Sequence, residues 1–138
     1  MTTNHAHELE STITDMVQPG KGILASDESA PTIAKRFAAI DVESTEEHRR
    51  SYRSLLFTAP GLGDCISGVI LFEETLEQHA DEGTPLPEVL GRQGIVPGIK
   101  VAKGKGPLPK SPGDQITYGQ DGLAERRQHY RTLGARLA

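Results

Sequence analysis

The sequence predicts an α/β fold with a parallel sheet, and three apolar runs carry this prediction. The runs cover residues 22–27, 66–72 and 95–101, and each of them stops abruptly at polar or charged residues. Stretches with apolar residues at helical spacing lie between the runs, so strands and helices alternate along the chain. Alternation of this kind is typical of a parallel sheet joined by right-handed crossovers.

Composition sets the outer limits of the fold and of the function. The chain has 138 residues, of which 36% are hydrophobic and 25% are charged, as in one ordinary soluble domain. A net charge of -4 argues against a nucleic-acid surface. The single cysteine, Cys65, excludes an internal disulfide, and no apolar run approaches the roughly 20 residues of a membrane span. With no signal-peptide pattern at the N-terminus, we expect a cytoplasmic protein.

The first element is a helix over residues 5–17, predicted because apolar residues recur there at helical spacing. These residues are Leu9, Ile13, Met16 and Val17. A Gln-Pro-Gly sequence ends the helix, and the strand at 22–27 follows. We expect Ile23 and Leu24 to lie in the core, while Asp27 lies at the carboxyl end of the strand.

Two helices separate the first strand from the second. The first covers residues 32–40, with three apolar residues on one face: Ile33, Phe37 and Ile40. The second opens at Ser44, which begins a Ser-x-x-Glu capping box that ends at Glu47, and it runs through Phe57. Apolar spacing predicts the buried face of this second helix: Tyr52, Leu55, Leu56 and Ala59.

The second half of the chain repeats the alternation. After the strand at 66–72 come a Gly- and Pro-rich loop and about one helical turn at 88–92. The strand at 95–101 follows. Residues 104–113 are rich in Gly and Pro, and we expect an irregular loop outside the core there. The last element is a helix over about 121–137, so we expect the chain to stop on a helix with no strand after it.

Charged side chains gather where the strands end. Asp27 follows the first strand, Glu73 and Glu74 follow the second, and Lys100 lies within the third. In parallel α/β folds ligands bind at the carboxyl ends of the strands, so Asp27 is predicted to face a site. From the residues alone, however, Asp27 and Ser29 are as well explained as caps of the turn after the strand. A lysine inside an apolar run is unusual, although a lysine whose stem lies along the surface is the ordinary alternative.

Three strand and helix units allow two closed architectures, a doubly wound sheet and a (β/α)₈ barrel. A barrel needs about 250 residues, so three units cannot close one. A three-stranded parallel sheet alone would leave two unpaired edges. From these arguments a small flavodoxin-like domain that binds a nucleotide or phosphate is one candidate. Its weakness is that no glycine-rich loop follows the first strand.

The histidines give no sign of a metal site. Their positions are scattered and show no metal-ligand spacing: His5, His7, His48, His79 and His129. We therefore predict no metal site, and we also expect no cofactor.

Long segments in a fixed order carry a resemblance to a known family. They are GKGILASDES, IAKRF, TEEHRRSYRSLLFT, GVILFEETL, GTPLPEVL, QGIVPGIKV and QDGLAERRQHYRTLGAR. Over essentially the whole chain they resemble the N-terminal portion of class I fructose-bisphosphate aldolases. The resemblance implies that residues 1–138 form a partial TIM (β/α)₈ barrel, namely its first three β/α units, incomplete in this chain.

The resemblance also implies an activity. Class I aldolases are lyases that reversibly cleave fructose 1,6-bisphosphate into dihydroxyacetone phosphate and glyceraldehyde 3-phosphate, in glycolysis. They do so through a lysine Schiff base, without a metal, and full-length members form homo-oligomers. Because the family's Schiff-base lysine and acid/base glutamate lie on later strands, we expect this chain alone to be inactive. The alternative is a truncated, non-catalytic fragment or a phosphate-binding or interaction module.

Family roles carry over only where the residues match. The resemblance places Asp27 at the active-site aspartate, which orients substrate hydroxyls and assists proton transfer. Lys100 matches the lysine that ends the third strand and faces this aspartate. Ser29, Thr32 and Arg36 fall on or near positions that meet a substrate phosphate. A guanidinium suits a pair of phosphate oxygens, which agrees with that role for Arg36.

Overall fold

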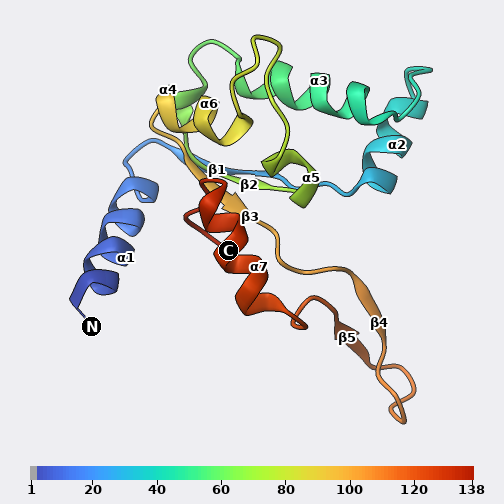
Figure 1. Ribbon diagram of the computed structural model, residues 1–138. Coiled ribbons are helices and arrows are strands. Elements are labelled where there is room, and N and C mark those ends of the chain that lie inside the picture. The colour runs from blue at the N-terminus through green and yellow to red at the C-terminus, as the bar shows by residue number, and fades with distance from the viewer. Residues whose placement is uncertain (1–2) are drawn as a thin grey trace.

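The computed structural model describes residues 3–138 and has a three-stranded parallel sheet at its centre (Figure 1). The strands are β1 (Gly22–Ser26), β2 (Ile66–Leu71) and β3 (Val96–Ile99), in the order β1-β2-β3. Both pairings are parallel, so the predicted α/β class and parallel sheet are confirmed. Each strand lies inside the range that the sequence predicts for it.

Helices and a small hairpin surround the sheet. Their bounds are α1 (Thr3–Met16), α2 (Ala30–Ala38), α3 (Glu46–Phe57), α4 (Leu62–Cys65), α5 (Glu73–Leu76), α6 (Leu86–Arg92), α7 (Leu123–Thr132), β4 (Lys105–Pro107) and β5 (Gln115–Thr117). In Figure 1, α3, α4 and α6 lie above the sheet, while α1 and α7 lie below it. Within residues 3–138, no helix is long and apolar enough to cross a membrane.

The core lies between the sheet and the helices α3 and α6. Its fully buried side chains include Phe57 of α3, Val69 and Leu71 of β2, and Leu90 of α6. Tyr130 of α7 reaches the same cluster. β2 is the central strand, and four of its six residues are buried, as expected for a largely apolar strand of a parallel sheet.

β1 is an edge strand, and this corrects one prediction. Ile23 was expected in the core, but half of its surface is exposed, and Leu24 is only partly buried. Ser26, at the end of the strand, is buried instead. β1 is an edge strand that pairs with β2 alone, and residues 22–25 are exposed or only partly buried.

The apolar stripe of α1 is exposed as well. Leu9, Ile13 and Val17 are all more than 60% exposed, whereas Thr12 is buried. Polar contacts hold α1 against the C-terminal segment, as when Arg136 donates to Thr12 Oγ1 at 3.0 Å. Helical spacing identified the stripe correctly, but spacing does not determine which face finds a partner.

α2 buries Ile33 and Phe37 as predicted, but it is displaced from the predicted range of 32–40. The helix ends at Ala38, so Ile40 lies beyond it and is 67% exposed. The prediction that Ile40 shares the buried face is therefore wrong.

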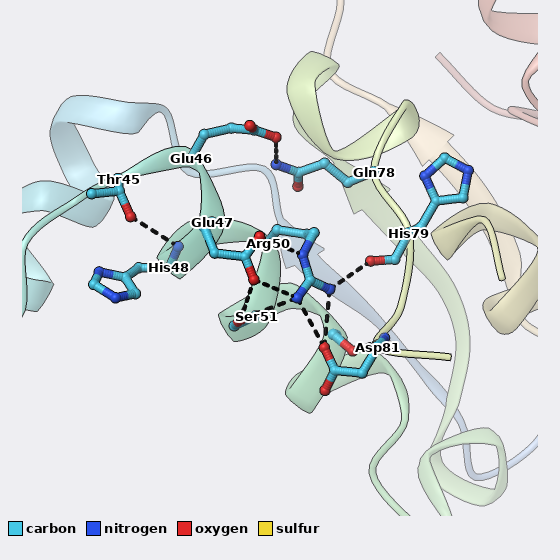
Figure 2. A network of polar contacts seen from close by, with 10 residues as sticks. Thr45, Glu46, Glu47, His48, Arg50, Ser51, Gln78, His79 and Asp81 are labelled. Atoms are coloured by element: carbon cyan, nitrogen blue, oxygen red, sulfur yellow. Dashed lines mark hydrogen bonds and ion pairs between the residues drawn. The ribbon is translucent and has the colours of Figure 1, made fainter. Parts of the chain in front are cut away.

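The cap of α3 lies one residue later than predicted. Thr45, rather than Ser44, is the N-cap residue, and its Oγ1 accepts a hydrogen bond from the backbone N–H of His48 at 3.1 Å (Figure 2). Ser44 instead accepts hydrogen bonds from Arg49. Glu47 is therefore not the last residue of a capping box, and its carboxylate pairs with Arg50.

The buried face of α3 also differs from the predicted one. The side chains that it buries are Arg53, Ser54 and Phe57, whereas Leu55 is 74% exposed. Phe57 faces the core, and the helical repeat then turns Arg53 inward and Leu55 outward. An arginine tolerates this position because a carboxylate meets it there, which apolar spacing does not reveal.

Residues 104–113 are more ordered than the expected irregular loop. β4 pairs with β5 in antiparallel register, with Gly106 opposite Ile116. A Cβ at Gly106 would overlap the Tyr118 ring, so this glycine lets the ring lie against the backbone. The hairpin projects away from the sheet and is mostly exposed, which places it outside the core as expected (Figure 1).

The last residues do not continue α7, which ends at Thr132 rather than near 137. Gly134 has a φ of +100° and turns the chain. Leu137 then forms a parallel bridge with Gly98, and its carbonyl accepts from Ile99 N at 2.9 Å. The prediction that the chain stops on a helix is wrong, because these residues pair with the free edge of β3.

Candidate active site

Asp27 and Lys100 meet at the carboxyl edge of the sheet. Lys100 Nζ lies 3.3 Å from Asp27 Oδ2, and it also donates a hydrogen bond to the Asp27 carbonyl. Both side chains are a little more than a quarter exposed, so the pair is accessible from solvent. The Lys100 ammonium also lies 5.2 Å from the centroid of the Phe72 ring.

The strand order explains this meeting. Asp27 directly follows β1 and Lys100 directly follows β3, while β2 lies between them. Parallel strands end at the same edge, so residues that are 73 positions apart in the sequence come together there. Lys100 is anchored further because its backbone N–H donates to the Leu71 carbonyl at 3.0 Å.

A buried arginine lies beside Asp27. Arg53 of α3 is only 2% exposed, and its Nη1 donates to Ser26 Oγ and, at 2.9 Å, to Glu28 Oε2. Its Nη2 donates to the Glu28 carbonyl at 3.3 Å. Arg53 is not among the residues predicted for the site, because nothing in the local spacing of α3 distinguishes it from a solvated charge.

Glu28 is shared between two arginines. Its Oε2 meets Arg53, and its Oε1 meets Arg36 of α2. Burial by itself raises the pKa of Glu28, but its own backbone N–H and the guanidinium groups of Arg53 and Arg36 outweigh burial and lower that pKa. Glu28 is therefore held as a carboxylate between one buried and one exposed cation.

The three predicted phosphate-binding residues lie along α2, with Ser29 and Thr32 at its start and Arg36 in its last turn. Ser29 is the N-cap residue of this helix, and its Oγ lies 3.1 Å from Thr32 Oγ1. Arg36 follows Thr32 by four residues, which places it one helical turn further along. Its side chain is 56% exposed while the guanidinium pairs with Glu28. The structure thus brings Ser29 and Thr32 together and ties Arg36 to the same loop.

A second charged cluster lies at the end of β2. Tyr130 Oη donates to Glu73 Oε1 at 2.5 Å, and Lys103 Nζ lies 3.2 Å from Glu73 Oε2. The Tyr130 hydroxyl, and after it Lys103 and Arg126, lower the pKa of Glu73 although partial burial raises it. The charged residues at this strand end were visible in the sequence, but the contribution of α7 was not.

A polar network fixes α3 relative to the segment after β2 (Figure 2). Arg50 pairs with Glu47 on its own helix and with Asp81, at 3.0 Å, and it donates to the His79 carbonyl. Gln78 Nε2 donates to Glu46 Oε1 at 3.2 Å on the same side. These contacts join α3 to residues 78–81 rather than to the loop around Asp27.

The arrangement can do two things chemically. The Asp27 carboxylate and the Lys100 ammonium can hydrogen-bond neighbouring hydroxyl groups of a bound molecule, and a carboxylate can also accept a proton. The hydroxyls and the guanidinium of α2 can hold an anion such as phosphate. Within residues 3–138, no group of three or more His, Cys, Asp or Glu side chains could hold a metal ion.

Comparisons with known proteins give one consistent family. The family model of fructose-bisphosphate aldolase class-I matches residues 8–138. A probable fructose-bisphosphate aldolase class 1 of Xanthomonas axonopodis pv. citri is 54% identical over 131 residues, which are 95% of this chain and 39% of that protein. Fructose-bisphosphate aldolase 7, cytosolic, of Arabidopsis thaliana is 50% identical over 99% of this chain and 38% of its own length.

A solved structure agrees with these relatives. Fructose-bisphosphate aldolase from Plasmodium falciparum, crystallised with TRAP and a small-molecule inhibitor, matches with a TM-score of 0.92 at 50% sequence identity. The match covers 98% of this chain and 39% of that one. The chain therefore spans about two fifths of the length of the relatives that it matches.

Proposed function

Because the chain belongs to the class I fructose-bisphosphate aldolase family, we propose that residues 1–138 supply one part of the active site of such a lyase. The reaction is the reversible cleavage of fructose 1,6-bisphosphate into dihydroxyacetone phosphate and glyceraldehyde 3-phosphate, in glycolysis. The observation that carries the proposal is the pairing of Asp27 with Lys100 at the carboxyl edge of the sheet.

In this proposal β1, β2 and β3 are the first three strands of a (β/α)₈ barrel, and residues 1–138 are a partial barrel domain. The parallel order of the strands supports this, since a barrel sheet is parallel throughout. The pairing of Leu137 with Gly98 also supports it, because it extends the sheet beyond β3. The exposed outer faces of β1 and α1 would then be covered by the rest of the barrel.

Asp27 and Lys100 act on the sugar hydroxyls. In cleavage, the substrate ketone condenses with a lysine amine and releases water. The bond between C3 and C4 then breaks, the iminium takes the electron pair, and the C4 hydroxyl loses its proton to a base. We assign to Asp27 the orientation of hydroxyls and help with proton transfer. Lys100 holds the Asp27 carboxylate in place and donates to substrate oxygens.

Ser29, Thr32 and Arg36 are assigned to a substrate phosphate. The Ser29 and Thr32 hydroxyls lie side by side at the start of α2. Of the two arginine side chains that pair with Glu28, that of Arg36 is the more exposed. A phosphate bound here would share Arg36 with Glu28. Because Glu28 also has Arg53 as a partner, it stays paired when Arg36 turns to an anion.

None of the six lysines of this chain is proposed as the Schiff-base nucleophile. Lys100 and Lys103 lie near the carboxyl edge of the parallel sheet, and the side-chain nitrogen of each is already paired with a carboxylate, that of Asp27 and that of Glu73. We therefore propose that the 138-residue chain does not cleave the substrate on its own. We further propose a cytoplasmic location, supported by the cytosolic relatives, and homo-oligomers for the complete enzyme.

Grafting tests the proposal. The chain replaces the matching 39% of the Xanthomonas axonopodis relative, and cleavage of fructose 1,6-bisphosphate is measured for the graft and for the 138-residue chain alone. We expect an active graft, in which Asp27→Asn and Lys100→Met each lower kcat at least about a hundredfold. Lys110→Met on the exposed hairpin is the matched control and should leave kcat unchanged.

Borohydride trapping and mass analysis complete the test. The chain alone should give neither turnover nor a lysine adduct. Turnover with an adduct on Lys100 or Lys103 would overturn the assignment of the nucleophile to another part of the enzyme. A folded graft that binds the bisphosphate but cleaves nothing would favour the alternative function, a phosphate-binding module built on the Ser29, Thr32 and Arg36 cluster.

A further inference from the structure

We propose that Arg53 is a positioning residue that aims the Asp27 carboxylate at Lys100. Its guanidinium fixes the residues immediately before and after Asp27, and the carboxylate between them is thereby held toward β3. The importance of this geometry for catalysis rests on the proposed function, but the geometry can be tested without any substrate.

The hydrogen bonds of Arg53 bracket Asp27. All three bonds from Arg53 to this loop go to Ser26 and Glu28, the two neighbours of Asp27, rather than to Asp27 itself. Ser26 is 1% exposed, so its hydroxyl has no ready access to water as an alternative partner. A planar guanidinium with five donors can hold two such groups at once, which a single ammonium cannot do as well.

The position of Arg53 is itself well determined. Its Cζ lies 5.3 Å from the centroid of the Tyr52 ring, and that ring packs edge-on against Phe37 at 5.8 Å. The α3 helix that carries Arg53 is held by Arg49, which binds both carboxylate oxygens of Glu74. A side chain anchored in this way can transmit the position of the helix to the loop.

The burial of Arg53 indicates that its charge serves a structural purpose. Leaving an arginine 2% exposed costs free energy unless its charge and donors are satisfied, and Glu28 with Ser26 satisfies them. The loop conformation that satisfies Arg53 is also the one in which Lys100 reaches both the carboxylate and the carbonyl of Asp27. Loss of the guanidinium should therefore loosen the pair of Asp27 and Lys100.

Amine labelling of the 138-residue chain measures this loosening directly. Each lysine is methylated with formaldehyde and a mild reductant at limiting reagent, and the extent of modification is read by peptide mass. In Asp27→Asn, Lys100 loses its carboxylate partner, and we expect its labelling to rise about fivefold, the ratio that matches about 1 kcal/mol of partly exposed ion pairing. We expect the same rise in Arg53→Met, and no further rise in the double variant.

Two controls separate positioning from general loosening. Lys35 and Lys110 are exposed and take no part in the proposed contacts of Arg53, so their labelling should stay unchanged in every variant. Arg50→Met removes another multiply bonded arginine of α3, whose partners are Glu47, Asp81 and a backbone carbonyl, and it should leave Lys100 unchanged.

The proposal is overturned if Arg53→Met leaves the labelling of Lys100 at the wild-type level, or if the labelling of all lysines rises together. If circular dichroism shows that Arg53→Met does not fold, Ser26→Ala decides instead, because it removes one bond to Arg53 and should raise Lys100 labelling about twofold. If the labelling of Lys100 is unchanged in Ser26→Ala, the proposal is refuted. If labelling behaves as expected while the grafted enzyme is inactive, the positioning role stands and the proposed function fails.

Discussion

Lys100 Nζ lies 3.3 Å from Asp27 Oδ2, although the two residues follow different strands with a third strand between them. The same ammonium donates to the Asp27 carbonyl, so it contacts both the side chain and the backbone of one residue. A contact of this kind depends on the order β1-β2-β3 and on all three strands ending at one edge.

A double-mutant cycle should show that Asp27 and Lys100 are coupled. Asp27→Asn, Lys100→Met and the double variant are compared by urea unfolding of the 138-residue chain. Because the pair is partly exposed, we expect a coupling free energy of about 0.5–1 kcal/mol. Strictly additive effects would mean that the two side chains do not interact in solution.

Acid should destabilise the chain through Glu28. Its pKa is lowered in the folded state, so the stabilisation that it provides is complete above the ordinary pKa of a glutamate, about 4.3, and is lost as the pH falls through the lower folded value. The free energy of unfolding of Glu28→Gln should therefore vary less between about pH 6 and about pH 3 than that of the wild type. Glu82→Gln, at an exposed position, is the control and should keep the wild-type slope.

Two leucines should respond very differently to truncation. Leu90→Ala leaves a cavity in the core between β2, α3 and α6, and we expect it to cost about 2–5 kcal/mol of unfolding free energy. Leu55→Ala, at a side chain that is 74% exposed, should change that free energy by no more than about 0.5 kcal/mol. Equal costs in denaturant unfolding would contradict the orientation of α3 in the structure.

Gly106→Ala, which adds a methyl group, should open the hairpin of β4 and β5. The new Cβ collides with the Tyr118 ring, so amide exchange at Tyr118, whose N–H donates to the Gly104 carbonyl at 2.9 Å, should speed up about tenfold. Tyr118→Ala removes the ring. The double variant should then exchange no faster than Tyr118→Ala alone, and a persistent tenfold difference would show that the ring is not the obstacle.

Arg36 should matter for binding the bisphosphate more than for the chemical step. In the grafted enzyme, Arg36→Met should raise KM for fructose 1,6-bisphosphate about tenfold while kcat changes little, because a charge-assisted contact to a phosphate is lost. Lys35→Met changes the adjacent cation and serves as the control. A fall in kcat with KM unchanged would place Arg36 in the chemistry instead.

Much of the fold was predictable from local patterns. The three apolar runs predicted the three parallel strands, because the strands of parallel sheets are rich in apolar residues. The predicted strand ends were one or two residues late, because the first run was taken to include Asp27 and the third to include Lys100, whereas β1 ends at Ser26 and β3 at Ile99. The family resemblance, carried by long segments in order, is confirmed by the match to residues 8–138. The roles of Asp27, Lys100, Ser29, Thr32 and Arg36 remain predictions.

The misplaced details share one cause. Leu55 and Ile23 are apolar and were assigned to the core, yet both are exposed, while Arg53 is buried. Periodicity tells which side chains share a face but not which face meets another element. The hairpin was missed for a related reason, since Gly106 is a poor strand residue by itself and acquires its role only when Tyr118 lies against it.

By itself, the sequence determined the alternation of strands and helices, the polar residues at the strand ends and the family. The strands, the helices and the polar residues that end the strands follow from hydrogen bonding and apolar spacing over short stretches. The family follows from the order of whole segments. The family resemblance already placed Lys100 opposite Asp27, but only the tertiary structure decided that Arg53 holds Ser26 and Glu28 on either side of that aspartate. The burial of a charge depends on a partner that lies far away in the sequence, and folding alone brings the two together.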